Sequence, residues 1–346
     1  MKHDNNFDLL RLLAAIGVVA LHVVDLTGEP ALAWLGRIDT KIALSTFFII
    51  SGYLIVQSWE RSPSLRSYID KRCRRILPAY VAVVVGMVLI GAALTTLPLR
   101  EYFGVATLKY LLANLAFLNF IQPTLPGVFD GQVLPSVNGA LWTIKVEVMF
   151  YACVPLLVLF IRRLGPWPVL IAGYIGACLW WGGFTHLAER TGRGAWFELA
   201  KQMPGQLMYF LPGAALYYAR DWVARHGAAM GAVCAWALFA AVALDWTYLY
   251  PLALAGCVVF VALTLPRLAN ATRFGDLSYG IYVWHFPLIQ TLITLGAFKA
   301  HPYIGLGLLI VLLPLIALAS WHLVEKRFLL HQRGSPAAVA AAAPSY

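Results

Sequence analysis

Two ionisable side chains, Arg11 and His22, lie within one apolar segment, residues 7–23, separated by ten residues. Because an α-helix turns by about 100° per residue, eleven steps amount to three turns plus roughly 20°, which places both side chains on one helix face about 16 Å apart. An arginine in the middle of a membrane helix costs about 2.5–3.5 kcal/mol even on the lenient insertion scale, so such residues are usually functional. The alternative is that Arg11 extends to the cytoplasmic surface while His22 bonds a neighbouring helix.

A second polar group stands in LWTIKVEVMFY, residues 141–151. Glu147 has Thr143 four residues before it and Tyr151 four residues after it, so all three would share one helix face. A lone carboxylate at membrane depth needs a cation, a histidine or water as a partner. Lys145 lies nearly opposite Glu147 on the helix and could either extend outward or face the bundle.

Two further segments combine small and polar residues. Residues 277–288, LSYGIYVWHFPL, set Ser278, Tyr282 and His285 on one stripe of hydrogen-bonding groups. Residues 47–55, FFIISGYLI, place Ser51 and Gly52 in the middle of a span, where small residues let helices approach closely. Both patterns fit helix packing as well as function.

The strongest electrostatic feature is the basic run within SYIDKRCRRILPAY, residues 67–80, which lies in the expected cytoplasmic loop between the spans at 41–58 and 76–96. Lys71, Arg72, Arg74 and Arg75 place four cations in five residues. They could serve as an orientation signal that contacts anionic lipids. Alternatively, they could bind the phosphates of a cytosolic ligand such as coenzyme A, because arginine forks bind phosphate bidentately.

Composition identifies a membrane protein. Hydrophobic residues make up 61% of the 346 residues and charged residues only 12%, about half the usual globular share. A hydropathy window predicts an all-α polytopic bundle of about ten spans. These spans lie near residues 7–25, 41–58, 76–96, 139–161, 167–183, 204–219, 228–245, 248–265, 276–297 and 303–324.

The loops give the expected orientation. With the N-terminus inside, every short cytoplasmic loop is basic, so both termini are expected in the cytoplasm and the net charge of +10 is attributed to this bias and not to nucleic-acid binding. Residues 107–122 are apolar but short, so we expect a re-entrant or interfacial helix within a long outer loop. Residues 1–331 are expected to form one transmembrane domain and residues 332–346 a disordered cytoplasmic tail. The five cysteines show no metal-binding spacing, and no metal is expected.

In this order along the chain, these segments resemble acyltransferase family 3 of integral membrane proteins. The resemblance rests on seven motifs: Arg11 with His22, FFIISGYL, R-x-x-R-x-x-P from Arg72 to Pro78, LWTIKVEVMFY with Glu147, FLPGAALYY at residues 210–218, SYGIYVWHFP at residues 278–287, and Glu325 with Lys326. It implies a multi-pass protein of the bacterial inner membrane. Its implied reaction moves an acyl group, usually acetyl, from cytosolic acyl-coenzyme A to a hydroxyl of an extracytoplasmic glycan or glycolipid.

The chemistry of acyl transfer from a thioester, together with this resemblance, gives the polar residues expected roles. His22 would be the general base, with Arg11 holding the donor or stabilising charge, and Glu147 would orient His22 or pair with Arg11. Residues Lys71, Arg72, Arg74 and Arg75 would bind coenzyme A, and Ser51, Trp142, Tyr282 and His285 would contact substrate. An acetyl-His22 intermediate is an alternative to direct transfer.

A membrane transporter or flippase for a glycan or small anion is the alternative class, since intramembrane charges also mark substrate paths. Transporters often show paired halves with interrupted helices, and the sequence shows no internal repeat. Membrane lipids and proteins of polysaccharide biosynthesis are the other expected partners.

Overall fold

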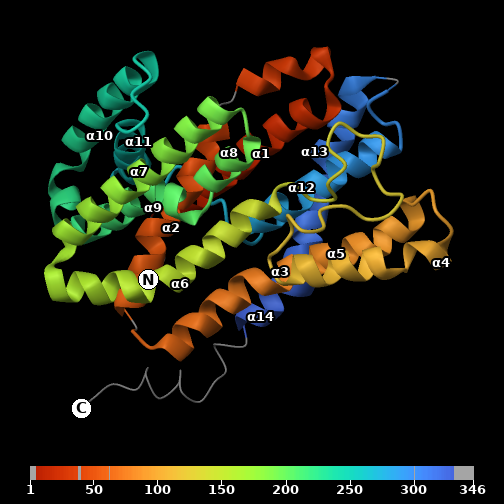
Figure 1. The fold of residues 1–346 in the computed structure, drawn as a ribbon. Coiled ribbons are helices and arrows are strands. Elements are labelled where there is room, and N and C mark those ends of the chain that lie inside the picture. The colour runs from red at the N-terminus through yellow and green to blue at the C-terminus, as the bar shows by residue number, and fades with distance from the viewer. Residues whose placement is uncertain (1–4, 38–39, 62, 300, 331–346) are drawn as a thin grey trace. The chain divides into compact units, whose positions relative to one another are not determined.

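A computed structural model describes residues 5–37, 40–61, 63–299 and 301–330 of the chain (Figure 1). All regular secondary structure in these ranges is helical, which confirms the predicted all-α class. The expected tail, residues 332–346, lies outside the described residues.

The chain forms two compact units, each assembled from three separate stretches. The first consists of Met1–Ala14, Asp39–Tyr68 and Thr143–Asn270, and the second of Ala15–Ile38, Ile69–Trp142 and Ala271–Tyr346. The expectation of a single domain stays a prediction.

The first unit holds the start of α1 (Phe7–Thr27), together with α2 (Thr40–Arg61), most of α6 (Leu141–Leu164), α7 (Pro166–Thr191), α8 (Gly194–Ala200), α9 (Met203–Tyr218), α10 (Arg220–Ala243), α11 (Tyr250–Val259) and the π-helix η2 (Phe260–Thr264). The second unit holds the rest of α1, the 3₁₀ helix η1 (Pro30–Arg37), most of α3 (Leu65–Leu94), α4 (Leu99–Tyr102), α5 (Val105–Leu115), α12 (Leu277–Thr294), α13 (Pro302–Ser320), the π-helix η3 (Trp321–Glu325) and α14 (Lys326–Leu330).

Each of the ten predicted spans coincides with a helix of the structure. Among the described residues, seven helices are long and apolar enough to cross a membrane: α1, α2, α3, α6, α7, α10 and the helix that continues from α13 to residue 329. The other three predicted spans fall on α9, on α11 with η2, and on α12. Helix α9 has only 16 residues, and α12 has 18 with several buried polar side chains, so neither reaches the length and hydropathy of the seven.

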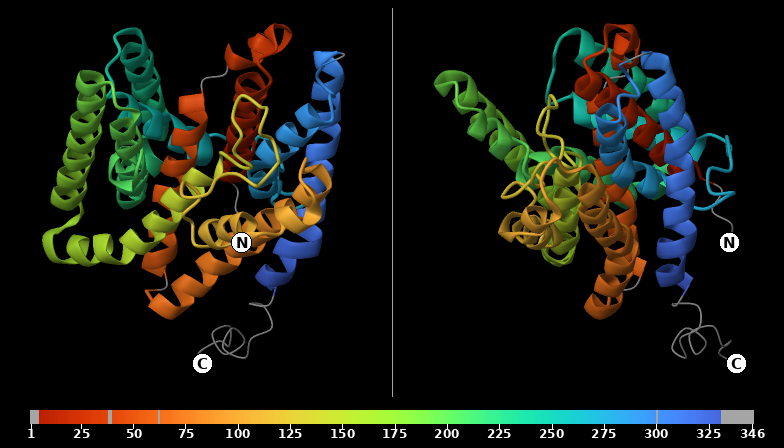
Figure 2. Two further views of the ribbon diagram at one scale, coloured as in Figure 1. Left: turned by 45° about the vertical axis from the view of Figure 1, so that its right-hand side comes forward. Right: turned by 90° about the vertical axis from the view of Figure 1, so that its right-hand side faces the viewer.

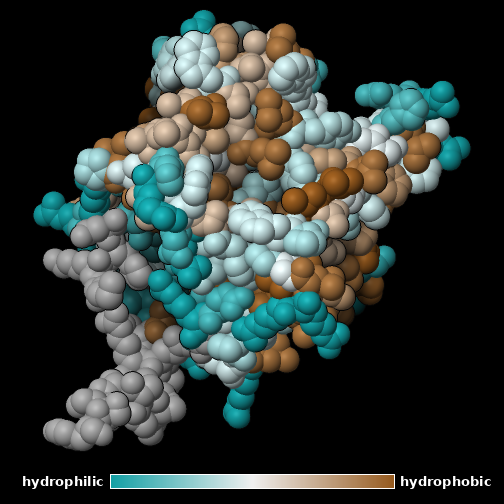
Figure 3. All heavy atoms as spheres, turned by 90° about the vertical axis from the view of Figure 1, so that its left-hand side faces the viewer, coloured by the Kyte–Doolittle hydropathy of each residue, from teal (hydrophilic) through white to brown (hydrophobic). Residues whose placement is uncertain are grey.

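Apolar side chains are exposed along the outer helix faces, as the brown side chains on one face of the molecule show (Figure 3). On α7, Ile171, Ile175 and Leu179 follow one another at four-residue spacing and are 57%, 52% and 71% exposed. An apolar stripe exposed on a helix of this length is what hydrocarbon contact requires, because lipid replaces protein as its neighbour.

Helices α2 and α9 of the first unit cross at two glycines. A Cβ atom at Gly52 would collide with the carbonyl oxygen of Phe210, and one at Gly213 would collide with the carbonyl oxygen of Ile49. The small residues predicted in the FFIISGYLI segment therefore serve close backbone approach. Helices α12 and α13 of the second unit also lie side by side (Figure 2).

The loop expected between the spans at 41–58 and 76–96 is wrong for residues 65–75, because α3 already begins at Leu65 and the basic run lies on its first turns. The cytoplasmic side of this segment stays a prediction. Residues such as leucine, lysine and arginine favour helix, and the Arg74 guanidinium donates to the Asp70 carboxylate at 2.7 Å, a pair at the i, i+4 spacing that supports the helix. The segment at residues 107–122 forms the eleven-residue α5, which is too short to span, followed by turns.

Candidate functional site

His22 and His285 meet in the second unit, although 263 residues separate them along the chain. His285 Nε2 lies 2.9 Å from His22 Nδ1, and His285 Nδ1 lies 2.6 Å from the carbonyl oxygen of Tyr282. The His285 ring is fully buried, whereas His22 is half-buried and lies in a T-shaped contact with the Phe286 ring, at 5.2 Å between ring centres. The sequence predicted both residues for the site but not this contact.

A loop side chain and a proline fix the part of α12 that carries His285. Pro287 has no backbone N–H, so the carbonyl of Val283, four residues earlier, lacks its helical donor. The Asn138 side chain replaces that donor, since its Nδ2 donates to the Val283 oxygen at 2.9 Å. The Asn138 Oδ1 also accepts from the Ala140 N–H at 3.2 Å, which holds the loop in place.

Two glutamines attach the same loop to the far end of α12. The fully buried Gln290 donates from Nε2 to the carbonyl oxygens of Leu134 and Ser136. Gln132 donates in return to the Gln290 carbonyl at 2.9 Å and to the Thr294 hydroxyl at 2.6 Å. The loop and helix therefore form one hydrogen-bonded unit around the position of His285.

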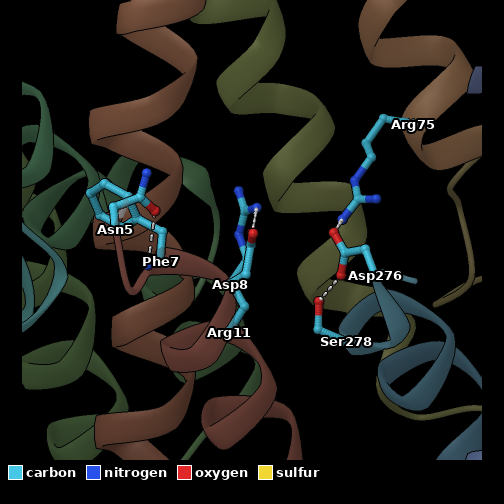
Figure 4. A network of polar contacts seen from close by, with 7 residues as sticks. All are labelled: Asn5, Phe7, Asp8, Arg11, Arg75, Asp276 and Ser278. Carbon is cyan, nitrogen blue, oxygen red and sulfur yellow. Dashed lines mark hydrogen bonds and ion pairs between the residues drawn. The ribbon is translucent and has the colours of Figure 1, made fainter. Parts of the chain in front are cut away.

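Arg75 of α3 is bound to the start of α12 (Figure 4). Its guanidinium donates to Asp276 Oδ2 at 2.6 Å, and the Ser278 hydroxyl donates to Asp276 Oδ1, also at 2.6 Å. Arg75 and Asp276 are only 24% and 17% exposed, so this ion pair is partly shielded from solvent. Arg75 also lies against the Tyr279 ring, with 5.8 Å from its Cζ atom to the ring centre.

The other cations of the predicted coenzyme A site lie on the same helix. Arg74 bonds Asp70 and also donates to the Phe328 carbonyl at 3.3 Å. Lys71 and Arg72 are both half-buried, and Arg72 stands one helical turn from Arg75. The structure thus places all four cations on the first turns of α3, with two of them bound to aspartates.

In the first unit, Arg11 lies one turn beyond Asp8 on α1, and its Nη1 atom is 3.7 Å from Asp8 Oδ1 (Figure 4). This is a loose pair between partly exposed groups. The Asn5 carboxamide oxygen accepts from the backbone N–H of Phe7 and satisfies one of the free donors at the helix start.

Glu147 accepts a hydrogen bond from the Tyr151 hydroxyl at 2.6 Å, which confirms that these two residues share a helix face. Lys145 donates to Gln202 Oε1 at 2.7 Å, so it faces a protein partner in the first unit. The pairing of Glu147 with Arg11 or His22 stays a prediction.

The remaining predicted substrate residues lie in different surroundings. Ser51 is 7% exposed, Tyr282 is 6% exposed, and Trp142 is half-buried in the first turn of α6. The Tyr282 hydroxyl lies 3.4 Å from the Ala140 carbonyl, a long hydrogen bond. Their contact with substrate stays a prediction.

Sequence reasoning missed Asn138, Gln290 and Asp276. Gln290 could have been found, because an amide inside an apolar segment is expensive unless it is bonded. Asn138 and Asp276 lie outside the predicted helix interiors, where polar residues are ordinary and give no signal. In the part of the chain that the structure describes, no cluster of three His, Cys, Asp or Glu side chains could hold a metal ion.

These features define a polytopic helical membrane protein. Its apolar helices carry hydrogen-bonded imidazole side chains, His22 and His285, and a hydrogen-bonded carboxylate, Glu147. A family model described as an acyltransferase domain matches residues 4–324, so the chain belongs to that acyltransferase family, as the motifs predicted.

Three curated relatives illustrate the similarity. Nodulation protein 10 of Rhizobium leguminosarum bv. viciae is 31% identical, over 94% of this chain and 93% of the relative. The O-acetyl transferase of Shigella phage Sf6 is 28% identical, over 97% of this chain and 98% of the relative. The peptidoglycan O-acetyltransferase OatA of Listeria monocytogenes is 25% identical over 83% of this chain, which spans only 50% of that protein. No solved structure matches the chain.

Proposed function

We propose that the protein is a membrane O-acyltransferase that moves an acetyl group from cytosolic acetyl-coenzyme A to a hydroxyl of an extracytoplasmic or lipid-linked glycan. The observation that carries the proposal is the half-buried His22 imidazole, held by His285 inside a helix of membrane-spanning length. Two of the relatives are named O-acetyl transferases, and one of these names peptidoglycan as the acceptor, which supports a glycan here.

His22 is proposed as the general base. A thioester is already activated, so the reaction needs removal of the hydroxyl proton, charge stabilisation at the carbonyl oxygen, and alignment of two substrates. The acceptor hydroxyl gives its proton to His22 while its oxygen bonds the thioester carbonyl carbon. The carbon–sulfur bond then breaks, and the departing thiolate takes the proton, so the products are the ester, coenzyme A and neutral His22.

The donor is proposed to bind through the cations of α3. Arg72 and Arg75 would contact coenzyme A phosphates, with Lys71 and Arg74 adding positive charge. Arg75 Nη2 donates to Asp276 Oδ2 at 2.6 Å, and this bond orients the guanidinium. Arg11 would hold the donor or stabilise charge, Glu147 would orient His22 or pair with Arg11, and Ser51, Trp142 and Tyr282 would contact substrate.

The proposed setting is the bacterial inner membrane, with both termini in the cytoplasm. That orientation places the start of α3 on the cytoplasmic side, where coenzyme A is available, and the outer loop at residues 97–138 on the side of the glycan. The positive-inside distribution of lysine and arginine supports it.

The experiment uses the purified full chain in liposomes with acetyl-coenzyme A labelled in the acetyl group. Label that appears as an alkali-labile ester on an added glycan fraction, with release of free coenzyme A, supports the proposal. Movement of a labelled glycan across the bilayer with no consumption of acetyl-coenzyme A would instead identify a transporter. Mass spectrometry of surface glycans from cells with and without the protein would then identify the acetylated hydroxyl.

A further inference from the structure

The hydrogen-bond directions around His285 follow from elementary chemistry. A backbone carbonyl can only accept, so the hydrogen in the 2.6 Å contact with Tyr282 belongs to His285 Nδ1. A neutral imidazole carries one N–H, so His285 Nε2 must then present a lone pair. The 2.9 Å contact with His22 Nδ1 therefore needs the hydrogen on His22, which leaves the basic lone pair of a neutral His22 on Nε2.

We infer that His285 is a positioning residue that holds His22 in the Nδ1–H tautomer, so that Nε2 of His22 is the atom that receives the acceptor proton. The inference rests on the proposed role of His22 as general base. It differs from the sequence expectation that His285 contacts substrate, because both ring nitrogens of His285 are already engaged by protein atoms and the ring is fully buried.

The pair also stabilises the charge that forms during transfer. When His22 Nε2 takes the hydroxyl proton, the ring becomes an imidazolium and its Nδ1–H bond to His285 becomes charge-assisted. Such bonds are shorter and roughly twice as strong as neutral ones. His285 keeps its own proton on Nδ1 throughout, and the proton on His22 Nε2 passes to the departing thiolate.

The neighbours of His285 suit this role. Asn138 bonds the carbonyl of Val283, two residues before His285, and Gln290 anchors α12 five residues after it. A ring held at both nitrogens on an anchored helix gives His22 one orientation instead of several, which is the function of the residue that orients a catalytic histidine.

The test compares His285→Gln with His285→Leu in the full chain in liposomes. Glutamine can place its Oε1 atom near the position of the imidazole Nε2 and accept from His22 Nδ1–H, whereas leucine fills the space without an acceptor. We expect kcat to fall about 10²-fold in the leucine variant, with the KM for acetyl-coenzyme A unchanged, and to recover at least about tenfold in the glutamine variant. Equal losses in both variants, or a change in KM alone, would overturn the inference.

A spectroscopic readout separates this inference from the proposed function. Nitrogen and carbon NMR shifts of labelled histidine distinguish the two neutral tautomers, and His22→Asn identifies the resonance that belongs to His22. We expect the Nδ1–H form in the wild-type protein and a shift toward Nε2–H in His285→Leu. A wild-type Nε2–H tautomer contradicts the inference whatever the activity, whereas an active His22→Ala variant contradicts the proposed base.

Discussion

Replacing Asn138 tests whether a loop side chain completes the hydrogen bonding of α12. Asn138→Ala removes the 2.9 Å bond to the Val283 carbonyl, which Pro287 already deprives of its helical donor. A buried acceptor without a partner costs about 1–3 kcal/mol. The Ala140 N–H loses its 3.2 Å acceptor in the same change, so the free energy of unfolding should fall by an amount in this range or slightly above it.

A second substitution isolates the Val283 bond. Pro287→Ala restores a backbone N–H four residues after Val283, so the helix itself can then satisfy that carbonyl. Asn138→Ala should cost less in the Pro287→Ala background than in the wild-type protein. The difference is the coupling free energy, which we expect to be about 1 kcal/mol, above the average of roughly 0.6 kcal/mol for hydrogen bonds within membrane proteins.

The assay is unfolding in mixed micelles by titration with a denaturing detergent, with all four proteins in the same lipid and detergent mixture. Loss of helicity and loss of tryptophan signal should coincide if one transition is measured. An Asn138→Ala cost that is the same with proline and with alanine at position 287 would refute the assignment of Asn138 as a replacement donor.

Three other experiments test separate parts of the molecule. His22→Ala should lower the rate of acetyl transfer by at least about 10²-fold, since general-base catalysis typically contributes about 10²–10⁴-fold. Membrane insertion, measured by protease protection, should stay normal. Arg72→Ala and Arg75→Ala should each weaken coenzyme A binding by about 1.5–3 kcal/mol, and unchanged affinity in both would assign the cations to topology and lipid contact. Gly52→Ala should lower the free energy of unfolding by about 1–3 kcal/mol, because α2 and α9 must separate to make room for the added Cβ. Gly176→Ala is the control: a Cβ there meets no neighbouring atom within 4 Å, so this change should be neutral or slightly stabilising.

Local features of the fold were predictable because they depend on short-range geometry. Hydropathy alone located a helix at every predicted span, and helical periodicity predicted that Tyr151 and Glu147 share a face, as their 2.6 Å bond confirms. The start of α3 was not predicted, because charged residues lower hydropathy while still favouring helix. A hydropathy window therefore marks the apolar part of a long helix and misses its polar end.

Long-range pairings could not be predicted from one sequence. The sequence identified His22 and His285 separately as site residues, but their contact depends on how α1 and α12 pack within the second unit. The same holds for Arg75, whose partner Asp276 lies 201 residues further along the chain. Periodicity constrains which residues share a face, but it gives no information on which faces meet.

Prolines help to distinguish polar residues that stabilise the fold from polar residues that could take part in the reaction. Pro155 in α6 leaves the Tyr151 carbonyl without its helical donor, and the Tyr68 hydroxyl donates to it at 2.9 Å, just as Asn138 serves Val283 in α12. Both side chains therefore repair a backbone that hydrocarbon cannot hydrate.

His22 and His285 have no such explanation, because the atom that each imidazole offers to the other belongs to a side chain and repairs no broken helix. A buried side chain that bonds the carbonyl four residues before a proline is accounted for by folding. One that bonds a second titratable side chain brings together two groups that are expensive at membrane depth, and that cost is the physical reason why we propose a catalytic role for the histidine pair.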